Sequence, residues 1–263
     1  MELPEQLPIK TSGSKKIRAI EKIRLRERLY VALAAKNSKE VECLLQKDIN
    51  PNRASKDKTT PLIAAIKTQD HDLIKLLLAA GADPGKPDRW KNFPLMEATR
   101  AKDIFTVKLL LQNKANPEIV GNDLQTPLIY SCEYFKSSGN LETIIYEFLK
   151  TRCNLNTKDN LGRTALHYIC TKNHSITSLL LKNGADPNIK DNFKVTPLLK
   201  ILIHGCKSTN QEDAQFLIAN VQELVAAGGN PDIKNRRGLS ARDYAKYTGL
   251  EFILDTKESH EQK

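Results

Sequence analysis

Short runs of leucine, isoleucine and valine recur along the chain, as at 73–78, 107–111 and 179–181. Apolar residues three or four positions apart share one face of a helix, so each run predicts a short helix with one buried face. Gly81 and Gly184 follow such runs, where glycine suits the left-handed residue that ends a helix. A helix this short cannot form a core alone. The pattern therefore predicts stacked helices that bury their apolar faces against one another.

A second motif, which precedes each leucine-rich run, predicts the start of another helix. Openings of the type Thr-Pro-Leu recur at intervals of 32–44 residues, and proline fits the first helical turn because its missing N–H would have no partner there. The openings begin at Thr60, Phe93, Thr126, Thr164, Thr196 and Ser240. Eight residues before each opening, a turn closes at Asn52, Gly85, Glu118, Asn156, Asn188 and Asp232. Because this spacing is constant, the extra residues of the longer units are expected between helices, around 136–140 and 205–211.

These marks together resemble the ankyrin repeat, a unit of about 33 residues with a Thr-Pro-Leu-His-x-Ala opening, two antiparallel helices and a hairpin finger. The strongest match is Gly162–His167, then Asn173-His174, then Leu179–Asp186. The resemblance implies an all-α fold, an ankyrin-repeat solenoid of stacked helix-turn-helix units with hairpin finger loops.

The same resemblance predicts the domain organisation. A basic N-terminal arm or leader would occupy residues 1–26, the ankyrin array 27–257 and a polar tail 258–263. The predicted units are 27–58, 59–91, 92–124, 125–162, 163–194, 195–238 and 239–257, of which the first is degenerate and the last terminal.

Charge is concentrated at the start of this chain of 263 residues. The formal net charge is +10, and residues 10–28 contribute +6 of it, so the repeats are nearly balanced. Two interpretations of the arm remain open. It is either a solvated leader with a polar cap helix, or a contact for an acidic protein, nucleic acid or anionic lipid. No apolar run has the length of a membrane span, and no signal peptide is visible, so we expect a cytoplasmic protein.

The sequence offers no recognisable catalytic or metal chemistry. It contains no glycine-rich phosphate loop, no His-Glu-x-x-His and no Gly-x-Ser-x-Gly. Its five cysteines include no Cys-x-x-Cys pair, so we expect buried free thiols, no disulfide and no metal site. His167 and His174 occupy the histidine positions of the ankyrin motif, where the ring usually bonds loop backbone. We therefore expect no catalytic residue, no cofactor and no enzyme activity.

Ankyrin repeats bind partners along a concave face of finger tips and inner helices, and the resemblance transfers these positions to this chain. The finger-tip positions are Lys56, Asp57, Arg89, Trp90, Asn122, Asp123, Asn160, Phe193, Arg236 and Arg237. The inner-helix positions are Lys67, Arg100, Glu133, Tyr134, Lys172 and His204. Aromatic and arginine side chains are the usual interface anchors. Alternatively, Trp90 and Phe193 pack on adjacent fingers and serve the fold.

The functional hypothesis is a non-catalytic protein-binding module, an adaptor or scaffold that acts as a monomer. Its partner would be a protein with an acidic and partly apolar segment. A first alternative is a secreted bacterial effector that acts on a host protein through the same surface in the host cytosol; an abundance of lysine and asparagine favours it. A second is binding of nucleic acid or an anionic surface by the basic arm, against which the nearly neutral repeats argue.

Overall fold

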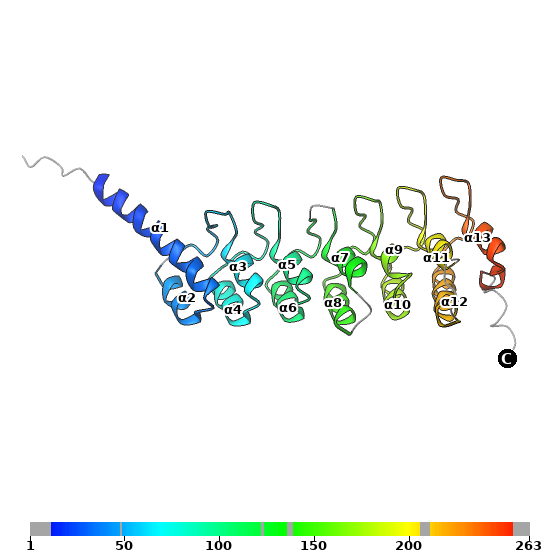
Figure 1. Cartoon of the computed structure of the whole chain (residues 1–263), viewed down its shortest axis with the longest axis horizontal. Helices are drawn as coiled ribbons and strands as arrows, with labels where there is room; N and C mark the ends of the chain where they lie inside the picture. The colour runs from blue at the N-terminus through cyan, green and yellow to red at the C-terminus, as the bar shows by residue number, and fades with distance from the viewer. Residues whose placement is uncertain (1–11, 48, 122–123, 136–138, 206–210, 255–263) are drawn as a thin grey trace, which may run out of the picture. The chain divides into compact units, whose positions relative to one another are not determined.

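The computed structural model describes residues 12–47, 49–121, 124–135, 139–205 and 211–254. These residues form two compact units, which divide after Pro94. The first unit contains α1 (Ser12–Ala34), α2 (Ser38–Leu45), α3 (Pro61–Thr68) and α4 (His71–Ala79), coloured blue to cyan in Figure 1.

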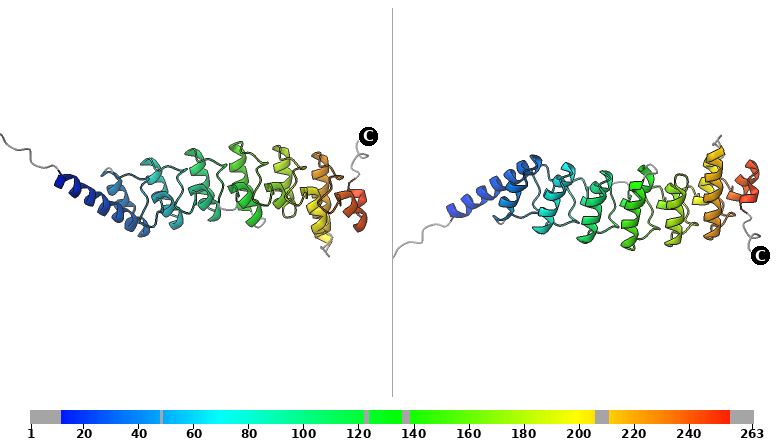
Figure 2. Two further views of the ribbon diagram at one scale, coloured as in Figure 1. Left: turned by 90° about the horizontal axis from the view of Figure 1, so that it is seen from above. Right: turned by 90° about the horizontal axis from the view of Figure 1, so that it is seen from below.

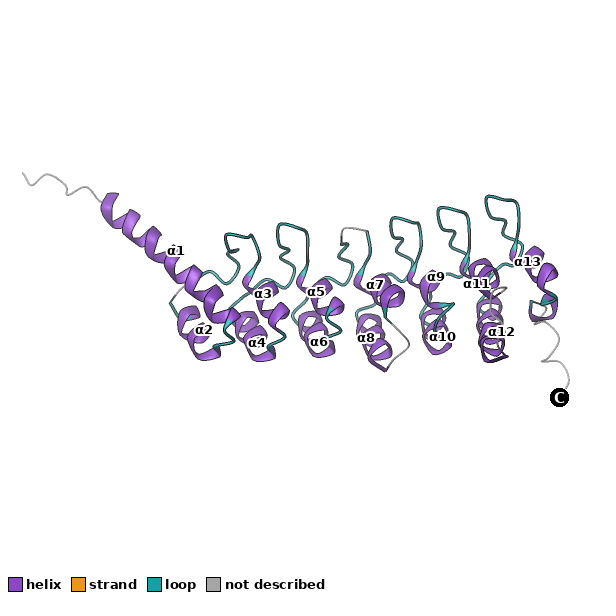
Figure 3. Ribbon diagram, in the orientation of Figure 1, coloured by secondary structure: helices purple, strands orange, loops and turns teal. Residues whose placement is uncertain are grey.

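The second unit continues the same alternation of helices and loops. Its helices are α5 (Pro94–Arg100), α6 (Ile104–Gln112), α7 (Pro127–Tyr134), α8 (Gly139–Lys150), α9 (Ala165–Ile169), α10 (His174–Lys182), α11 (Pro197–Gly205), α12 (Gln211–Ala226), α13 (Ala241–Thr248) and the 3-10 turn η1 (Glu251–Ile253). Within each unit, antiparallel helix pairs lie side by side (Figure 2). The described ranges contain helices and loops and no strand (Figure 3), so the predicted all-α repeat solenoid is confirmed.

The Thr-Pro-Leu openings are helix starts. Thr60 caps α3 by accepting a hydrogen bond from the main-chain N–H of Ile63 at 3.3 Å, with proline directly after the cap. Thr126 caps α7 in the same way through Ile129 at 3.3 Å. Each side chain satisfies an N–H that the first turn of a helix leaves without a partner. The recurring motif therefore sets where each inner helix begins.

The leucine-rich runs form the outer helices, as the pattern predicts. Leu73, Ile74 and Leu77 of α4 are fully buried. Gly81 follows this helix at φ 85° and Gly184 follows α10 at φ 93°, the left-handed region that side chains disfavour. Gly228 does the same after α12, at φ 86°.

Asparagine at three of the turn marks, Asn52, Asn156 and Asn188, joins neighbouring repeats. The amide of Asn52 accepts a hydrogen bond from the N–H of Asp83 at 2.7 Å and donates one to the carbonyl of Gly81 at 2.9 Å. Asn188 makes the equivalent pair with Asn230 at 2.7 Å and Gly228 at 2.9 Å. One side chain thus satisfies two main-chain groups of the next turn.

The two insertions fall between the helices of a pair. One separates α7 from α8, and the other separates α11 from α12. Residues 136–138 and 206–210 lie outside the described residues. Part of the added length becomes helix, because α8 has 12 residues and α12 has 16, against 9 in α4.

The basic N-terminal segment is helical from Ser12 onward. Helix α1 has 23 residues and runs through position 26, where the sequence placed the end of the arm. Its C-terminal half buries Leu29, Ala32 and Leu33 against α2 and α3. No helix in the described ranges has the length and apolarity needed to cross a membrane.

The cysteines only partly match their expected burial. Cys132 and Cys170 are fully buried free thiols, and Cys153 is half-buried. Cys43 is exposed, so the expectation of burial is wrong there. The reason is its position on α2, whose buried face carries Val41 and Leu44 instead. Cys206 lies outside the described residues.

Candidate partner-binding face

Six hairpin fingers carry the predicted tip positions. Each is a five-residue loop in which the N–H of the first residue donates to the carbonyl of the last, at 2.9–3.0 Å. The fingers are residues 55–59, 88–92, 121–125, 159–163, 191–195 and 235–239.

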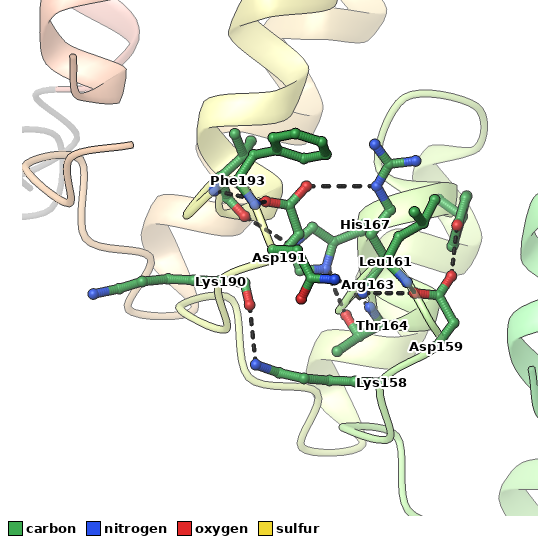
Figure 4. Close-up of polar contacts among 12 residues, drawn as sticks. Lys158, Asp159, Leu161, Arg163, Thr164, His167, Lys190, Asp191 and Phe193 are labelled. Atoms are coloured by element: carbon green, nitrogen blue, oxygen red, sulfur yellow. Dashed lines mark hydrogen bonds and ion pairs between the residues drawn. The ribbon is translucent and has the colours of Figure 1, made fainter. Parts of the chain in front are cut away.

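A side chain at the first position fixes most of these tips. The carboxylate of Asp191 accepts hydrogen bonds from the N–H groups of Phe193 at 2.8 Å and Val195 at 2.9 Å (Figure 4). Asp88 and Asp159 bond the N–H groups two and four residues ahead in the same way. Such a bond pattern holds a tight turn in one conformation. The side chain at the third position of the finger is therefore presented from a fixed backbone.

Adjacent fingers are also bonded to one another. The N–H of Asn192 donates to the carbonyl of Leu161 at 2.9 Å, and the N–H of Arg236 donates to that of Phe193 at 3.1 Å. The Lys158 ammonium reaches the carbonyl of Lys190 at 3.0 Å (Figure 4). Three consecutive fingers of the second unit thus form one rigid row.

The tip side chains face solvent. Trp90 is 44% exposed, and the guanidinium of Arg89 lies 4.3 Å from its ring centroid. Phe193 is 54% exposed, with the guanidinium of Arg236 at 5.7 Å. Lys56, Asp57, Asn160 and Arg237 are exposed as well, whereas Asn122 and Asp123 lie outside the described residues.

The inner-helix positions differ more among themselves. Tyr134 is 55% exposed and its ring lies 4.7 Å from that of Tyr130. The Lys172 ammonium donates to the carbonyls of Cys132, at 3.2 Å, and of Glu133, so its position is fixed.

The other four inner-helix positions differ in their exposure and in their polar contacts. Glu133 is half-buried and accepts a hydrogen bond from the side chain of Gln125. Arg100 pairs with Glu97 at 2.8 Å. Lys67 and His204 are exposed.

The structure adds a polar cluster around Tyr168 that the sequence did not indicate. The Tyr168 hydroxyl donates to the carboxylate of Asp159 at 2.6 Å. The Lys200 ammonium lies 4.7 Å from the centroid of the ring, and the Arg163 guanidinium lies 5.7 Å from it. Burial lowers the pKa of Lys200. The buried Tyr168 ring thus lies beside two half-buried cations, which give this part of the fold a positive charge.

Comparison with known families decides what these repeats are. A family model described as ankyrin repeats (3 copies) matches residues 21–88, 68–146, 95–191 and 136–226. The chain belongs to the ankyrin repeat family.

Several known proteins are similar to parts of the chain. A putative ankyrin repeat protein of Rickettsia bellii (strain RML369-C) is 36% identical over 89 residues, covering 33% of this chain and 88% of the relative. Mitochondrial disaggregase of Bos taurus is 25% identical over 178 residues, covering 53% of this chain and 26% of the relative. A putative ankyrin repeat protein of Acanthamoeba polyphaga mimivirus is 32% identical over 79 residues, covering 30% of this chain and 11% of the relative. The chain therefore spans about a quarter or less of the last two relatives.

Solved ankyrin structures share the fold. The ankyrin repeat domain of Bcl-3, a member of the IkappaB protein family, has a TM-score of 0.69 at 21% identity, over 86% of this chain and 97% of that one. An ankyrin repeat domain from Acinetobacter baumannii AYE has a TM-score of 0.65 at 25% identity, over 74% and 95%.

The two motif histidines of the ankyrin unit behave differently. His167 Nε2 lies 3.1 Å from the carbonyl of Val195 in the next finger, the backbone bond that the resemblance implies. His174 instead lies against the side chain of Asn220 in α12, with 3.3 Å between Nδ1 and Oδ1. The extended α12 brings Asn220 to this position, so the expected backbone bond is not the contact that His174 makes.

Among the described residues, no three or more His, Cys, Asp or Glu side chains gather in a way that could hold a metal ion. Burial raises the thiol pKa of both Cys132 and Cys170 to about 12. These thiols stay protonated at neutral pH, which suits packing and disfavours nucleophilic chemistry.

Proposed function

We propose that this ankyrin protein is a non-catalytic protein-binding module that engages its partner along the finger tips and inner helices. The row of rigid fingers carries the proposal. Leu161, Phe193 and Arg236 project from three consecutive fingers joined by main-chain hydrogen bonds. A prearranged surface loses little conformational entropy on binding, so its exposed apolar side chains can contribute to affinity.

The chemistry of this surface favours an acidic and partly apolar partner segment. Arginine lies beside both exposed tip aromatics, Trp90 and Phe193. Lys172, in the turn between α9 and α10, and Lys200 of α11 add positive charge. Carboxylates of a partner would meet these cations while its apolar side chains contact the rings.

The test compares two exposed aromatic residues on different surfaces. Phe193→Ser removes the aromatic side chain of one finger tip, which is 54% exposed. Tyr146→Ser removes an aromatic side chain of similar exposure (52%) from the outer helix α8. Proteins captured by the wild-type chain from bacterial and eukaryotic lysates should be lost with Phe193→Ser and kept with Tyr146→Ser. Equal capture by both variants would contradict the assignment of this face, provided that circular dichroism shows both to be folded.

An effector role on a host protein is the second candidate, with a host cytosol as the place of action. The similarity to a Rickettsia bellii protein supports it, since 88% of that relative is covered. A translocation reporter fused to the chain would test it: a reporter signal in host cells that depends on a secretion system supports the role, and its absence favours a protein that stays in the cytoplasm that makes it.

A further inference from the structure

A cationic pocket lies in the first unit, and none of its lining residues belongs to a finger. It is formed by α1 and the segment that follows α2. Lys22 and Arg26 lie one helical turn apart on α1, so they share a face. Lys47 and Arg53 enter from the segment after α2. Four cations of the described residues therefore converge on one hollow.

Hydrogen bonds hold the two sides of the pocket together. The single hydroxyl proton of Tyr30 on α1 is shared between the carbonyls of Thr59, at 2.7 Å, and of Arg53, at 3.1 Å. The N–H of Arg53 donates to the carbonyl of Asn50 at 3.2 Å, closing a turn. The position of the Arg53 backbone relative to α1 is thus fixed.

Other basic residues near the pocket are already paired with carboxylates. Arg28 lies 2.5 Å from Glu40, and Lys56 lies 2.6 Å from Glu27. Within the described ranges, no carboxylate lines the pocket and none forms an ion pair with its four cations. Asp48 lies outside the described residues, and one carboxylate would still leave an excess of three positive charges.

The remaining lining consists of three aliphatic residues and the polar Asn50. Ile23, Leu25 and Ile49 contribute apolar surface, and Ile23 is exposed although α1 has buried positions further along. No aromatic ring lines the pocket among the described residues, whereas single-stranded nucleic acid is usually held by stacking of bases on aromatic rings. A lining of cationic and aliphatic side chains instead matches a carboxylate-rich peptide that carries an aliphatic side chain.

We propose that this pocket binds an acidic segment of a protein partner, with partner carboxylates on Lys22, Arg26, Lys47 and Arg53 and a partner aliphatic side chain against Ile23 and Ile49. No finger residue lines the pocket, so this proposal can be tested independently of binding by the finger tips. Such a site gives the basic N-terminal segment a specific role beyond solvation.

The experiment measures fluorescence anisotropy of a short labelled peptide built of Glu, Asp and Leu. The full chain is compared with Lys22→Glu/Arg53→Glu and with Lys39→Glu/Lys86→Glu, a control pair with the same change in net charge on exposed lysines outside the pocket. We expect the pocket pair to weaken binding about tenfold or more and the control pair to change it little, because close charge pairs contribute more than distant screened ones.

Two further measurements examine the aliphatic lining residues and the class of partner. Ile23→Ser, at an exposed position that the fold does not need, should weaken binding of the same peptide, as should replacing the peptide leucines by serine. A single-stranded oligonucleotide of equal charge should bind more weakly than the peptide. Absence of peptide binding, equal losses with both charge pairs, indifference to Ile23→Ser, or tighter binding of the oligonucleotide would each overturn the proposal.

Discussion

At the scale of single residues, His167 shows how burial and hydrogen bonding select one protonation state. The ring is fully buried. Its Nδ1 accepts from the N–H of Thr164 at 3.1 Å, and its Nε2 faces the carbonyl of Val195 at 3.1 Å. An acceptor at Nδ1 and a donor at Nε2 describe the neutral ring with its proton on Nε2. Burial accordingly lowers the pKa of His167 from 6.5 to about 4.

This shift predicts a loss of stability in mild acid. Between pH 6.5 and about 4, the unfolded chain takes up a proton that folded His167 does not, so the free energy of unfolding decreases as pH falls through this window. The full effect is about 3 kcal/mol. Urea unfolding of wild type and His167→Gln across these pH values checks it. The variant is less stable at neutral pH but should lose less on acidification, whereas parallel pH profiles would contradict the shift.

Trp90 gives a prediction that separates binding from folding. Trp90 is 44% exposed, and its ring contacts Arg89. The main-chain N–H of Trp90 donates to the carboxylate of Asp88 at 2.8 Å. Trp90→Ala leaves that main-chain bond in place, so stability should fall by under about 1 kcal/mol, the size of an exposed cation–π contact. Affinity for a partner of the fingers should fall by about 2 kcal/mol. Lower stability with unchanged affinity would identify a structural tryptophan.

At the scale of elements, side-chain bridges between turns connect successive repeats. Asn188 satisfies one N–H and one carbonyl of the turn that follows α12. Asn52 and Asn156 make corresponding bonds to the turns after α4 and α10. These bonds lie between repeats, and they add to the apolar burial that holds neighbours together.

Removing one bridge should therefore loosen the junction between two repeats. Asn188→Ala leaves the N–H of Asn230 and the carbonyl of Gly228 without their partner, at an expected cost of about 1–2 kcal/mol. The matched control is Asn183→Ala, since the Asn183 amide bonds only within α10, to Leu179 at 2.8 Å. Chemical denaturation of the two variants checks this. A loss with Asn183→Ala as large as that with Asn188→Ala would argue against the bridging role.

The sequence predicts these elements well because their causes are local. Thr60 and Thr126 cap helices through bonds to residues three positions ahead, and Gly81 adopts a backbone angle that follows from the lack of a side chain. Such features repeat with the period of the chain and are visible without a structure. The bridging role of Asn188 was not visible, because its partners lie 40 and 42 residues away.

The candidate site is less predictable for the same reason. The exposed tips at Trp90 and Phe193 follow from their place in the repeat. The cluster of Tyr168, Lys200 and Arg163 combines a finger and two inner helices of neighbouring repeats, so no single motif contains it. The exposed side chain of Cys43 depends on which face of α2 meets its neighbours, which the leucine-rich run alone did not define.

At the scale of the whole molecule, each repeat obtains its core from its neighbours, and the cysteines are distributed accordingly. Cys132 lies in α7 and Cys170 follows α9, both fully buried within their repeats. Cys153 is half-buried, and its thiol pKa is raised to about 11, chiefly by burial. Only Cys43, among the described cysteines, is exposed. Stability should then depend on apolar burial and the hydrogen bonds described above, without help from disulfides or metal ions.

This distribution predicts both thiol reactivity and the response to reagents. In a Cys206→Ser background, which removes the cysteine outside the described residues, Ellman's reagent should modify Cys43 rapidly in the folded protein. Cys132 and Cys170 should react only on unfolding, because they are buried and their thiols stay protonated at neutral pH. The melting temperature should be unchanged by a chelator or a reductant, and Cys43→Ser should abolish the rapid phase without changing the melt. A drop of several degrees with either reagent, or rapid labelling of Cys132 in the native state, would show that a metal, a disulfide or an open repeat had been overlooked.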